Sequence, residues 1–301
     1  MSRVLVTGAE GFTGHYLVAE LLAAGYEVHG LVRQKTTEKA LGAFTTSACD
    51  LLDSAALTGL VARIRPAYVV HLAAIAFVGH GDVDAIYRTN VVGTRNLLSA
   101  LSAEADSLSA VLLASSANVY GNSTAGVIDE KTQPAPANDY AVSKLAMEYM
   151  AGIWADRLPI NIVRPFNYTG IGQSVDFLLP KIVDHYRRKA PVLELGNLDV
   201  ERDFSDVRTT VNCYRRLLNT PANSKVFNVC SGQGHTLRAV LDMAQQLSGH
   251  SLEVRVNSAF VRTNDVKKLI GSKVALEAAI GPVTGPDLRQ TLEWMLSAYS
   301  E

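Results

Sequence analysis

The order of apolar segments along the first half of the chain constrains its fold more than any other feature. Short runs rich in β-branched residues, typical of buried strands, alternate there with longer stretches of helical periodicity. The predicted strands are Val4–Thr7, Glu27–Val32, Ala67–Leu72, Ala110–Ala114 and Ile160–Arg164, and the predicted helices are Phe12–Ala24, Ser54–Ile64, Val83–Ala103 and Tyr140–Ala155. Strands and helices that alternate in this way form a parallel sheet with helices on both faces. We therefore expect an α/β protein with a doubly wound parallel sheet, which binds ligands at the carboxyl ends of its strands.

A glycine-rich segment joins the first predicted strand to the first predicted helix. Gly8, Gly11 and Gly14 have the spacing Gly-x-x-Gly-x-x-Gly, and Phe12 and Thr13 begin the helix within it. Glycines in such a turn let backbone N–H groups approach a pyrophosphate at the helix N-terminus. Three glycines alone also suit a turn without a ligand. Their position between a strand and a helix predicts a dinucleotide site of the Rossmann type, formed by these five residues.

The end of the second predicted strand indicates which dinucleotide is bound. A Rossmann unit contacts the adenosine ribose there, and an acidic side chain at that place favours NAD. This sequence has Val32-Arg33-Gln34, without an acid, and a guanidinium suits a 2′-phosphate. We therefore predict NADP(H), with NADH as a second accepted cofactor; Arg33 as an ordinary solvated arginine is the alternative. Other expected cofactor contacts are Asp50, Leu51, Leu72, Ala73 and Ala74.

Three residues form a candidate catalytic group. Tyr140 and Lys144 are four residues apart on a predicted helix, so both side chains lie on one face. A lysine charge nearby lowers the pKa of a phenol and makes it a usable acid or base. Ser116 follows a predicted strand, where it can hydrogen-bond a substrate oxygen beside Tyr140. A half-exposed helical face and a helix cap are the structural alternatives for these residues.

The second half of the chain departs from the strand–helix alternation. After Arg164 come loops with Pro and Gly, a predicted helix near Leu178–Arg188 and short strands, while Asp203–Leu218 and Val226–Val229 are expected to return to the main sheet. The predicted domains are an NADP(H)-binding Rossmann domain over residues 1–168, with segments near 203–230 returning to it, and a smaller substrate-binding lobe over residues 169–202 and 231–301.

Several of these motifs together resemble the extended short-chain dehydrogenase/reductases, and the resemblance covers essentially the whole chain. The segments that carry it are Gly8-x-x-Gly11-x-x-Gly14, Asp50-Leu51, His71-Leu72-Ala73-Ala74, Asn90-Val91-x-Gly93, Ser115-Ser116-x-x-Val119-Tyr120-Gly121 and Tyr140-x-x-x-Lys144. The resemblance implies an enzyme in which Ser116 is the catalytic serine and Tyr140 is the acid/base. It also implies that Lys144 contacts the nicotinamide ribose and tunes Tyr140.

Three later segments resemble enzymes of the GDP-mannose pathway. They are Arg164-Pro-Phe-Asn167-Tyr-Thr-Gly-Ile-Gly-Gln173, Leu195–Val207 and Phe227–Gln233. The resemblance implies that a GDP-linked deoxysugar is contacted by Asn167, Lys181, Arg202 and Arg262. Arginine recognises a diphosphate with two parallel hydrogen bonds, whereas surface salt bridges are the alternative for Arg202 and Arg262. The first segment departs from the family pattern at Tyr168 and Ile171, which stand in place of His and Pro.

The residues after Ser116 narrow the implied reaction. Family members that remove water carry a carboxylate where Asn118 stands, and members that epimerise before reducing have a cysteine where Ala117 stands. The resemblance therefore implies NADP(H)-dependent reduction at C4. The reaction it resembles most is the conversion of GDP-4-keto-6-deoxy-D-mannose to GDP-D-rhamnose, with Tyr140 as proton donor. A nucleotide-sugar C4 epimerase with a retained cofactor is the alternative. A non-catalytic dinucleotide-sensing regulator is more distant, because such proteins commonly lose the Tyr/Lys pair.

Composition argues against several other classes. Of the 301 residues 48% are hydrophobic, which allows a large core, and the formal net charge of −1 argues against nucleic-acid and membrane surfaces. Because no signal peptide and no apolar run of about 18 residues is present, we expect a cytoplasmic protein. Cys49, Cys213 and Cys230 lack metal-ligand spacing, so we expect buried free thiols and no metal site.

The resemblance also implies a homodimer. The contact is expected through the helices that begin near Val83 and Tyr140. The apolar residues of these helices would equally suit an ordinary core; they are Leu97, Leu98, Leu101, Leu145, Met147 and Met150.

Overall fold

The computed structural model describes residues 2–33, 44–76, 81–121, 126–221, 225–258 and 267–298. Within them the largest element is a seven-stranded parallel sheet with the order β11-β7-β5-β4-β1-β2-β3. Its strands are β1 (Arg3–Thr7), β2 (Glu27–Val32), β3 (Thr45–Ala48), β4 (Tyr68–His71), β5 (Ala110–Ala114), β7 (Ile160–Pro165) and β11 (Val226–Val229). The strand order reverses direction between β1 and β4, which is the topology of a doubly wound sheet. The predicted α/β fold is confirmed.

The central strand β1 shows why this sheet forms. Val4, Leu5 and Val6 are each 0% exposed. Val4 and Val6 pack into the core on one face of the sheet, while Leu5 packs into the core on the other face. Since side chains of a strand alternate between faces, a continuous apolar run fits only a strand that is covered on both sides. Each such side chain contributes about 1.5–3 kcal/mol when fully buried.

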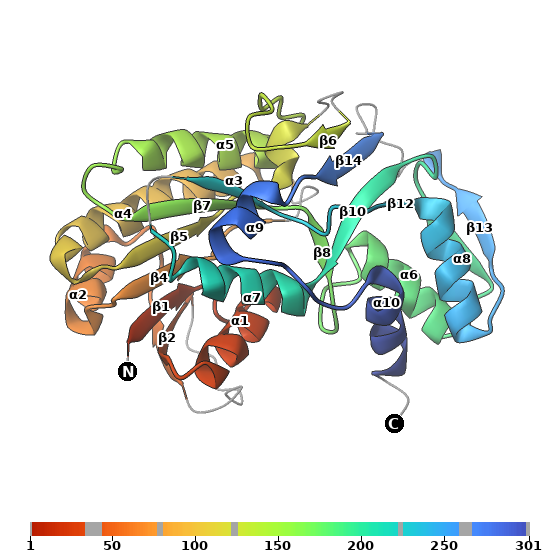
Figure 1. Ribbon diagram of the computed structural model, residues 1–301, viewed down its shortest axis with the longest axis horizontal. Coiled ribbons are helices and arrows are strands. Elements are labelled where there is room, and N and C mark those ends of the chain that lie inside the picture. Colours follow the sequence, from red (N-terminus) through yellow and green to blue (C-terminus); the bar gives the residue numbers. More distant parts are fainter. Residues whose placement is uncertain are drawn as a thin grey trace.

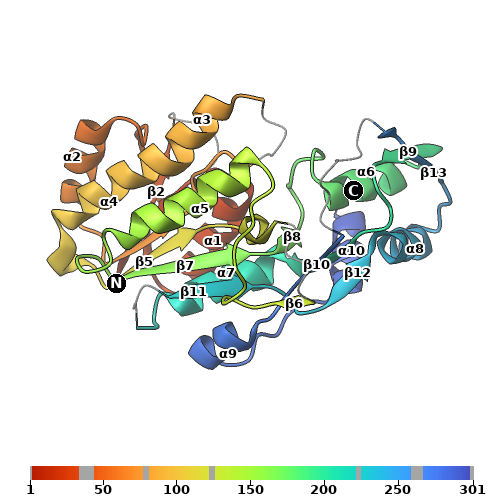
Figure 2. The same ribbon diagram turned by 90° about the horizontal axis from the view of Figure 1, so that it is seen from above.

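Helices cover both faces of the sheet, as Figures 1 and 2 show. On one face lie α1 (Phe12–Ala23), α7 (Val207–Leu217) and α9 (Val274–Ile280); on the other lie α2 (Ser54–Ile64), α3 (Val83–Tyr87), α4 (Thr94–Ser102) and α5 (Asp139–Gly152). A π-helical turn, η1 (Arg88–Gly93), joins α3 to α4, so the helix expected over Val83–Ala103 contains a wider turn. Such turns occur frequently at functional sites. Two short 3₁₀ helices are η2 (Ala105–Ser107) and η3 (Ala117–Tyr120).

The remaining elements form a smaller lobe beside the carboxyl ends of the main strands (Figure 1). In the described residues β12 (Gly234–Thr236), β10 (Glu201–Asp206), β14 (Lys268–Gly271) and β6 (Val127–Ile128) form one sheet in that order, and β8 (Asn167–Thr169) pairs with β10. A second pair is β9 (Val192–Leu195) with β13 (Glu253–Val256), and the helices are α6 (Leu178–Arg187), α8 (Leu237–Ser248) and α10 (Leu288–Ser297). These helices enclose a separate apolar core.

The segments expected to return to the main sheet lie in different places. β11 is its edge strand, and α7 packs beside α1 over one face, whereas β10 belongs to the sheet of the smaller lobe. Strand β3, at the opposite edge, has mostly exposed residues (Thr45, Thr46 and Ala48), so no apolar pattern defines its bounds.

Candidate active site

The glycine turn after β1 is packed too closely for larger residues. Gly8 has a φ of +69°, and a Cβ on it would lie 2.9 Å from the backbone nitrogen of Ala73 after β4. A Cβ on Gly14 would overlap the carbonyl oxygen of Gly8. Gly11 caps α1 without any side-chain hydrogen bond to the helix, so the first-turn N–H groups have no side-chain cap. A tight glycine turn with open helix N–H groups fits the pyrophosphate of a dinucleotide.

Polar side chains hold the loop after β4 in place, where β1 and β4 end side by side. His71 is 2% exposed, with Nδ1 2.7 Å from the Thr7 hydroxyl and Nε2 2.8 Å from that of Thr94. The Thr94 hydroxyl donates to the carbonyl of Asn90, so Nε2 must be the protonated nitrogen. Burial lowers the pKa of His71 to about 3, which keeps the imidazole neutral.

Asn90, in the π-helical turn, joins this loop to α5. Its side-chain oxygen accepts from the backbone N–H of Ile75 at 2.9 Å, and its Nδ2 donates to the hydroxyl of Ser143 at 3.0 Å. Asn90 thus connects the loop after β4 to the helix that carries Tyr140 and Lys144. Leu72 and Ala74 lie half-buried on that loop, beside Ala73.

The structure brings the three candidate catalytic residues together. Ser116 follows β5, while Tyr140 and Lys144 lie on the first turns of α5; they are 8%, 8% and 4% exposed. Ser116 lies close enough to Tyr140 for its hydroxyl to influence the pKa of the phenol. The Nζ of Lys144 donates to the carbonyl of Ala114 at 2.7 Å. Ser116 also caps η3 by accepting from the N–H of Asn118 at 3.1 Å, so its expected catalytic role and its cap alternative coexist.

Burial dominates the electrostatics of this group. It raises the pKa of Tyr140, and the neighbouring Ser116 opposes the shift only in part. Burial likewise lowers the pKa of Lys144 to about 8, against the charge of Glu148. The sequence predicted that Lys144 would lower the pKa of Tyr140. In the structure the cost of burying a phenolate outweighs other influences, so Tyr140 stays protonated.

An acidic residue to which the sequence did not point lies beside the backbone of Arg33. The exposed Arg33 donates its backbone N–H to Glu10 Oε1 at 3.3 Å. The two segments meet because the N–H of Gly8 binds the carbonyl of Leu31, 3.1 Å away. A carboxylate therefore lies against the backbone of Arg33, where only a base was expected. The signal for it is the position of Glu10 inside the glycine turn.

Asp50 and Leu51, two of the expected cofactor contacts, follow β3. An Asp50 carboxylate oxygen accepts from the N–H of Leu52 at 2.9 Å, and the carbonyl of Leu51 accepts from Nδ2 of Asn96 at 2.9 Å. Leu51 is 6% exposed. These hydrogen bonds hold the turn against the helix layer.

Tyr168, noted only as a departure from the family pattern, contacts the glycine turn directly. Its hydroxyl lies 2.8 Å from that of Thr13, and its ring stacks on Phe12 with centroids 6.2 Å apart. The contact spans 155 positions of sequence, so no local pattern predicts it. The signal that the sequence offers for Tyr168 is its place directly after Asn167, an expected substrate contact.

The expected substrate contacts occupy two places in the smaller lobe. Asn167 begins β8 and donates to the carbonyl of Asp203 at 3.3 Å, so it lies next to Arg202 of β10. Arg202 is half-buried and donates to the carbonyl of Glu201 at 3.1 Å. Lys181 lies on α6, where its Nζ donates to the carbonyl of Glu194 at 2.8 Å. Arg262 lies outside the described residues.

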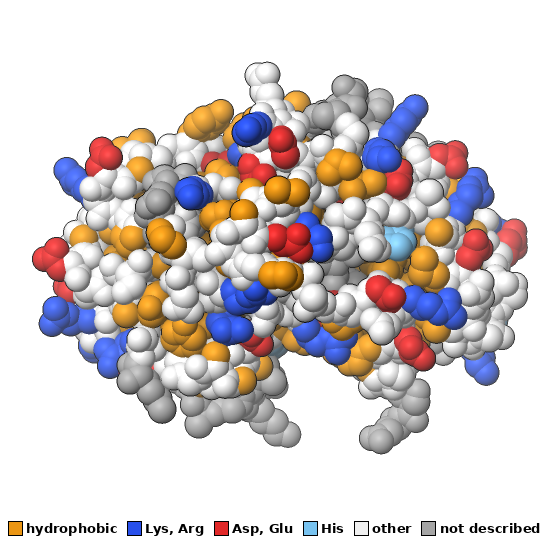
Figure 3. Space-filling model, viewed as in Figure 1, with side chains coloured by type: hydrophobic (Ala, Val, Ile, Leu, Met, Phe, Trp, Pro, Cys, Tyr) orange, Lys and Arg blue, Asp and Glu red, His pale blue; other side chains and the backbone are white. Residues whose placement is uncertain are grey.

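The three cysteines are free and buried, as expected. Acidic and basic side chains are interspersed on the face seen in Figure 3. None of the described helices is both long and apolar enough to span a bilayer. The described part of the chain contains no cluster of His, Cys, Asp and Glu that could hold a metal ion.

Several curated relatives match nearly the whole chain, among them two named for GDP-linked 6-deoxy sugars. A GDP-6-deoxy-D-talose 4-dehydrogenase of Aggregatibacter actinomycetemcomitans is 32% identical over 93% of this chain and 91% of its own length. A GDP-6-deoxy-D-mannose reductase of Pseudomonas aeruginosa is 33% identical over 99% of this chain and 97% of its own length.

Solved structures agree with this match. A Burkholderia cenocepacia J2315 protein is 52% identical, with a TM-score of 0.93 over 99% of this chain and 97% of its own. The RMD protein of Pseudomonas aeruginosa, complexed with NADPH, is 32% identical, with a TM-score of 0.84 over 99% and 98% of the two chains. The sequence profile of the NAD dependent epimerase/dehydratase family matches residues 4–230. This protein is therefore an enzyme of the NAD-dependent epimerase/dehydratase family, that is, an extended short-chain dehydrogenase/reductase.

Proposed function

We propose that this enzyme reduces the 4-keto group of a GDP-linked 4-keto-6-deoxyhexose with NADPH, converting GDP-4-keto-6-deoxy-D-mannose to GDP-D-rhamnose. The observation that carries the proposal is the buried group of Ser116, Tyr140 and Lys144. Because burial raises its pKa, Tyr140 stays protonated at neutral pH, as a proton donor in a reduction must. Two of the curated relatives are named for GDP-linked 6-deoxy sugars.

The proposed mechanism assigns one task to each residue. When bound, NADPH supplies the hydride. The Ser116 hydroxyl donates a hydrogen bond to the C4 oxygen and polarises the carbonyl. Tyr140 gives its proton to that oxygen as negative charge develops, so the ketone becomes a secondary alcohol and the phenol becomes a phenolate. The ammonium of Lys144 favours that phenolate until Tyr140 recovers a proton from solvent.

The residues around the glycine turn complete the proposed site. Gly8, Gly11 and Gly14 allow the pyrophosphate to approach the open N-terminus of α1. We assign the exposed Arg33, which follows β2, to the 2′-phosphate of NADPH, with NADH as the second cofactor. We assign Asn167, Lys181, Arg202 and Arg262 to the nucleotide sugar.

The first experiment measures NADPH oxidation at 340 nm with GDP-4-keto-6-deoxy-D-mannose. We expect stoichiometric oxidation, and a loss of about 10²- to 10⁴-fold in kcat for Tyr140→Phe. Tyr26→Phe is the control, because that hydroxyl binds exposed Asn219 away from the site. NMR of the product then assigns the configuration at C4, which separates rhamnose from talose. If wild type leaves NADPH unoxidised, the proposal fails, and C4 epimerisation of intact nucleotide sugars is tested instead.

We further propose that the enzyme is a homodimer. Exposed apolar side chains lie along α3, η1 and α5; they are Val83, Val92, Val142, Tyr149 and Ile153. The apolar residues named from the sequence are not among them: Leu97, Leu98, Leu101 and Met147 are at most 1% exposed within this chain's own core, and Leu145 and Met150 pack against it. Light scattering of the purified protein measures the oligomeric state directly.

A further inference from the structure

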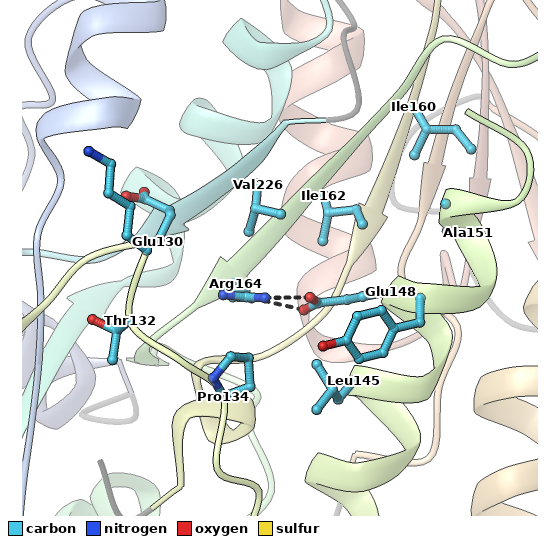
Figure 4. Close-up of a pocket in the computed structure, with 13 residues that line it drawn as sticks. Glu130, Thr132, Pro134, Leu145, Glu148, Ala151, Ile160, Ile162, Arg164 and Val226 are labelled. Atoms are coloured by element: carbon cyan, nitrogen blue, oxygen red, sulfur yellow. Dashed lines mark hydrogen bonds and ion pairs between the residues drawn. The ribbon is translucent and has the colours of Figure 1, made fainter. Parts of the chain in front are cut away.

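A buried ion pair lies next to the proposed catalytic group, one turn of α5 after Lys144. Arg164 of β7 donates from Nε and Nη2 to the two oxygens of Glu148 on α5, at 2.9 and 2.6 Å. Both side chains are only 7% exposed. Figure 4 shows the pair among the apolar side chains of Ile162, Val226 and Leu145. Removing two charges from water is costly, so such a pair is weak evidence for stability and suggests another role.

The other hydrogen bonds of the pair reach the two ends of one short segment. The hydroxyl of Ser115 donates to Glu148 Oε1 at 2.5 Å. Nη1 of Arg164 donates to the hydroxyl of Tyr120 at 3.0 Å, and that hydroxyl donates to Asn228 on β11 at 2.7 Å. Segment 115–120 contains Ser116. The ion pair therefore holds the catalytic serine from both sides of its own loop.

The same helix also binds the strand end before this segment. Lys144 and Glu148 lie one turn apart on α5, and they bind Ala114 and Ser115 respectively. The backbone N–H of Ser115 donates to the carbonyl of Val163, next to Arg164. Two successive turns of α5 and the neighbouring strand thus fix one point of the chain, from which Ser116 projects.

We propose that Glu148 and Arg164 are positioning residues, which hold segment 115–120 so that Ser116 and Lys144 keep their places beside Tyr140. This inference rests on the proposed function, because it concerns the same catalytic group. Glu148 has a second effect, since its charge opposes the lowering of the Lys144 pKa by burial. His71 also faces Lys144, and burial keeps its imidazole neutral.

We call the hold of Glu148 and Arg164 on segment 115–120 the clamp. Two variants test it while leaving the ion pair intact. Ser115→Ala removes the bond to Glu148, and Tyr120→Phe removes the bond to Arg164. We expect each to lower kcat about tenfold with little change in the KM for NADPH, because a small misplacement of a catalytic group slows the reaction. Tyr186→Phe is the matched control, since its buried hydroxyl binds the carbonyl of Leu241 in the smaller lobe. Wild-type kcat in both test variants would overturn the proposal.

A pH profile separates positioning by the pair from the charge effect of Glu148. We expect kcat to fall at alkaline pH as Lys144 loses its proton. In Glu148→Gln this alkaline limb of the pH profile should move to lower pH, because Lys144 loses the carboxylate that supports its charge. Ser115→Ala and Tyr120→Phe keep that carboxylate, so their limb should stay at the wild-type pH. Glu148→Gln leaves a buried guanidinium unpaired and can unfold the chain, so thermal unfolding is measured first. A folded Glu148→Gln with an unshifted limb would contradict the charge effect.

Crystal structures of the two clamp variants separate this inference from the proposed function. If wild type turns over no 4-keto sugar, the proposed function fails, and kcat can no longer report on the clamp. The position of Ser116 still does. A displaced segment 115–120 in Ser115→Ala and Tyr120→Phe would support the clamp, whereas an unmoved Ser116 would overturn it.

Discussion

The two ends of the proposed dinucleotide site are built in different ways. At the catalytic end Ser116, Tyr140 and Lys144 are at most 8% exposed. At the proposed adenosine end Arg33 and Glu10 are both exposed, and a hydrogen bond of 3.3 Å joins the backbone N–H of Arg33 to the Glu10 carboxylate. Interactions between polar groups are stronger where water is excluded and weaker where it screens them. We therefore expect the buried end to be fixed in advance for chemistry and the exposed end to discriminate between ligands by small energies.

The largest effect is expected at the buried end, from Lys144→Met. Lys144 has a pKa of about 8, so kcat for reduction should fall as the pH rises through that value and the ammonium is lost. In Lys144→Met the charge is absent at every pH, so this limb should vanish and kcat should be about a hundredfold lower near neutral pH. Lys225→Met, at an exposed position before β11, is the control. A variant that keeps both the wild-type limb and its rate would show that Lys144 does not support Tyr140.

The same residue links pH to stability in the cofactor-free protein. Burial lowers its pKa from 10.5 to about 8, so between these values the unfolded chain binds more protons than the folded chain. The free energy of unfolding should therefore increase with pH across this window, and Lys144→Met should remove that contribution. Urea unfolding at several pH values measures the difference between the two proteins. Parallel curves for wild type and variant would contradict the assignment.

An intermediate effect is expected between the two ends, at the glycine turn. A Cβ on Gly14 would overlap the carbonyl oxygen of Gly8, so Gly14→Ala must displace the turn. We expect NADPH affinity to fall about tenfold or more, because the N–H groups of α1 move away from the pyrophosphate. Gly59→Ala at an exposed position of α2 is a matched control, since nothing lies within 4 Å of its added Cβ. That change should stabilise the protein by up to about 1 kcal/mol. Unchanged NADPH binding in Gly14→Ala would exclude this turn as the cofactor site.

Sequence alone predicts the features of this enzyme that depend on local pattern. Buried strands, the glycine turn and the spacing of Tyr140 and Lys144 are all visible within short windows. Features that depend on packing between distant segments are not. Tyr168 reaches Thr13 only because β8 packs beside the glycine turn, and Glu10 meets Arg33 only because β1 and β2 are neighbours.

The sequence also could not predict the direction in which the pKa of Tyr140 shifts. Lys144 is four residues away in any helix, which predicts a lowered pKa for the phenol. How deeply the phenol is buried depends on the whole fold, and burial decides the direction in the structure. The predicted residues are thus brought together, while their electrostatics differ from the prediction.

The smallest effect is expected at the exposed end, where cofactor preference is set. Arg33→Ala should lower the preference for NADPH over NADH by about two- to fivefold, because an exposed charge pair contributes at most about 1 kcal/mol. Glu10→Gln should raise that preference by a similar factor, since its carboxylate repels a 2′-phosphate. Glu27→Gln, an exposed carboxylate at the start of β2 paired with Arg3, is the control.

Salt dependence completes the comparison between the two ends. Exposed charges are largely screened at high ionic strength, so raising salt from about 0.05 to 0.5 M should reduce the effects of Arg33→Ala and Glu10→Gln. The kcat defect of Lys144→Met should persist, because its environment excludes water and ions. If the cofactor preference in Arg33→Ala is unchanged at low salt, the 2′-phosphate is recognised elsewhere. If Lys144→Met recovers with salt, the catalytic end is open to solvent, and the contrast between the two ends is lost.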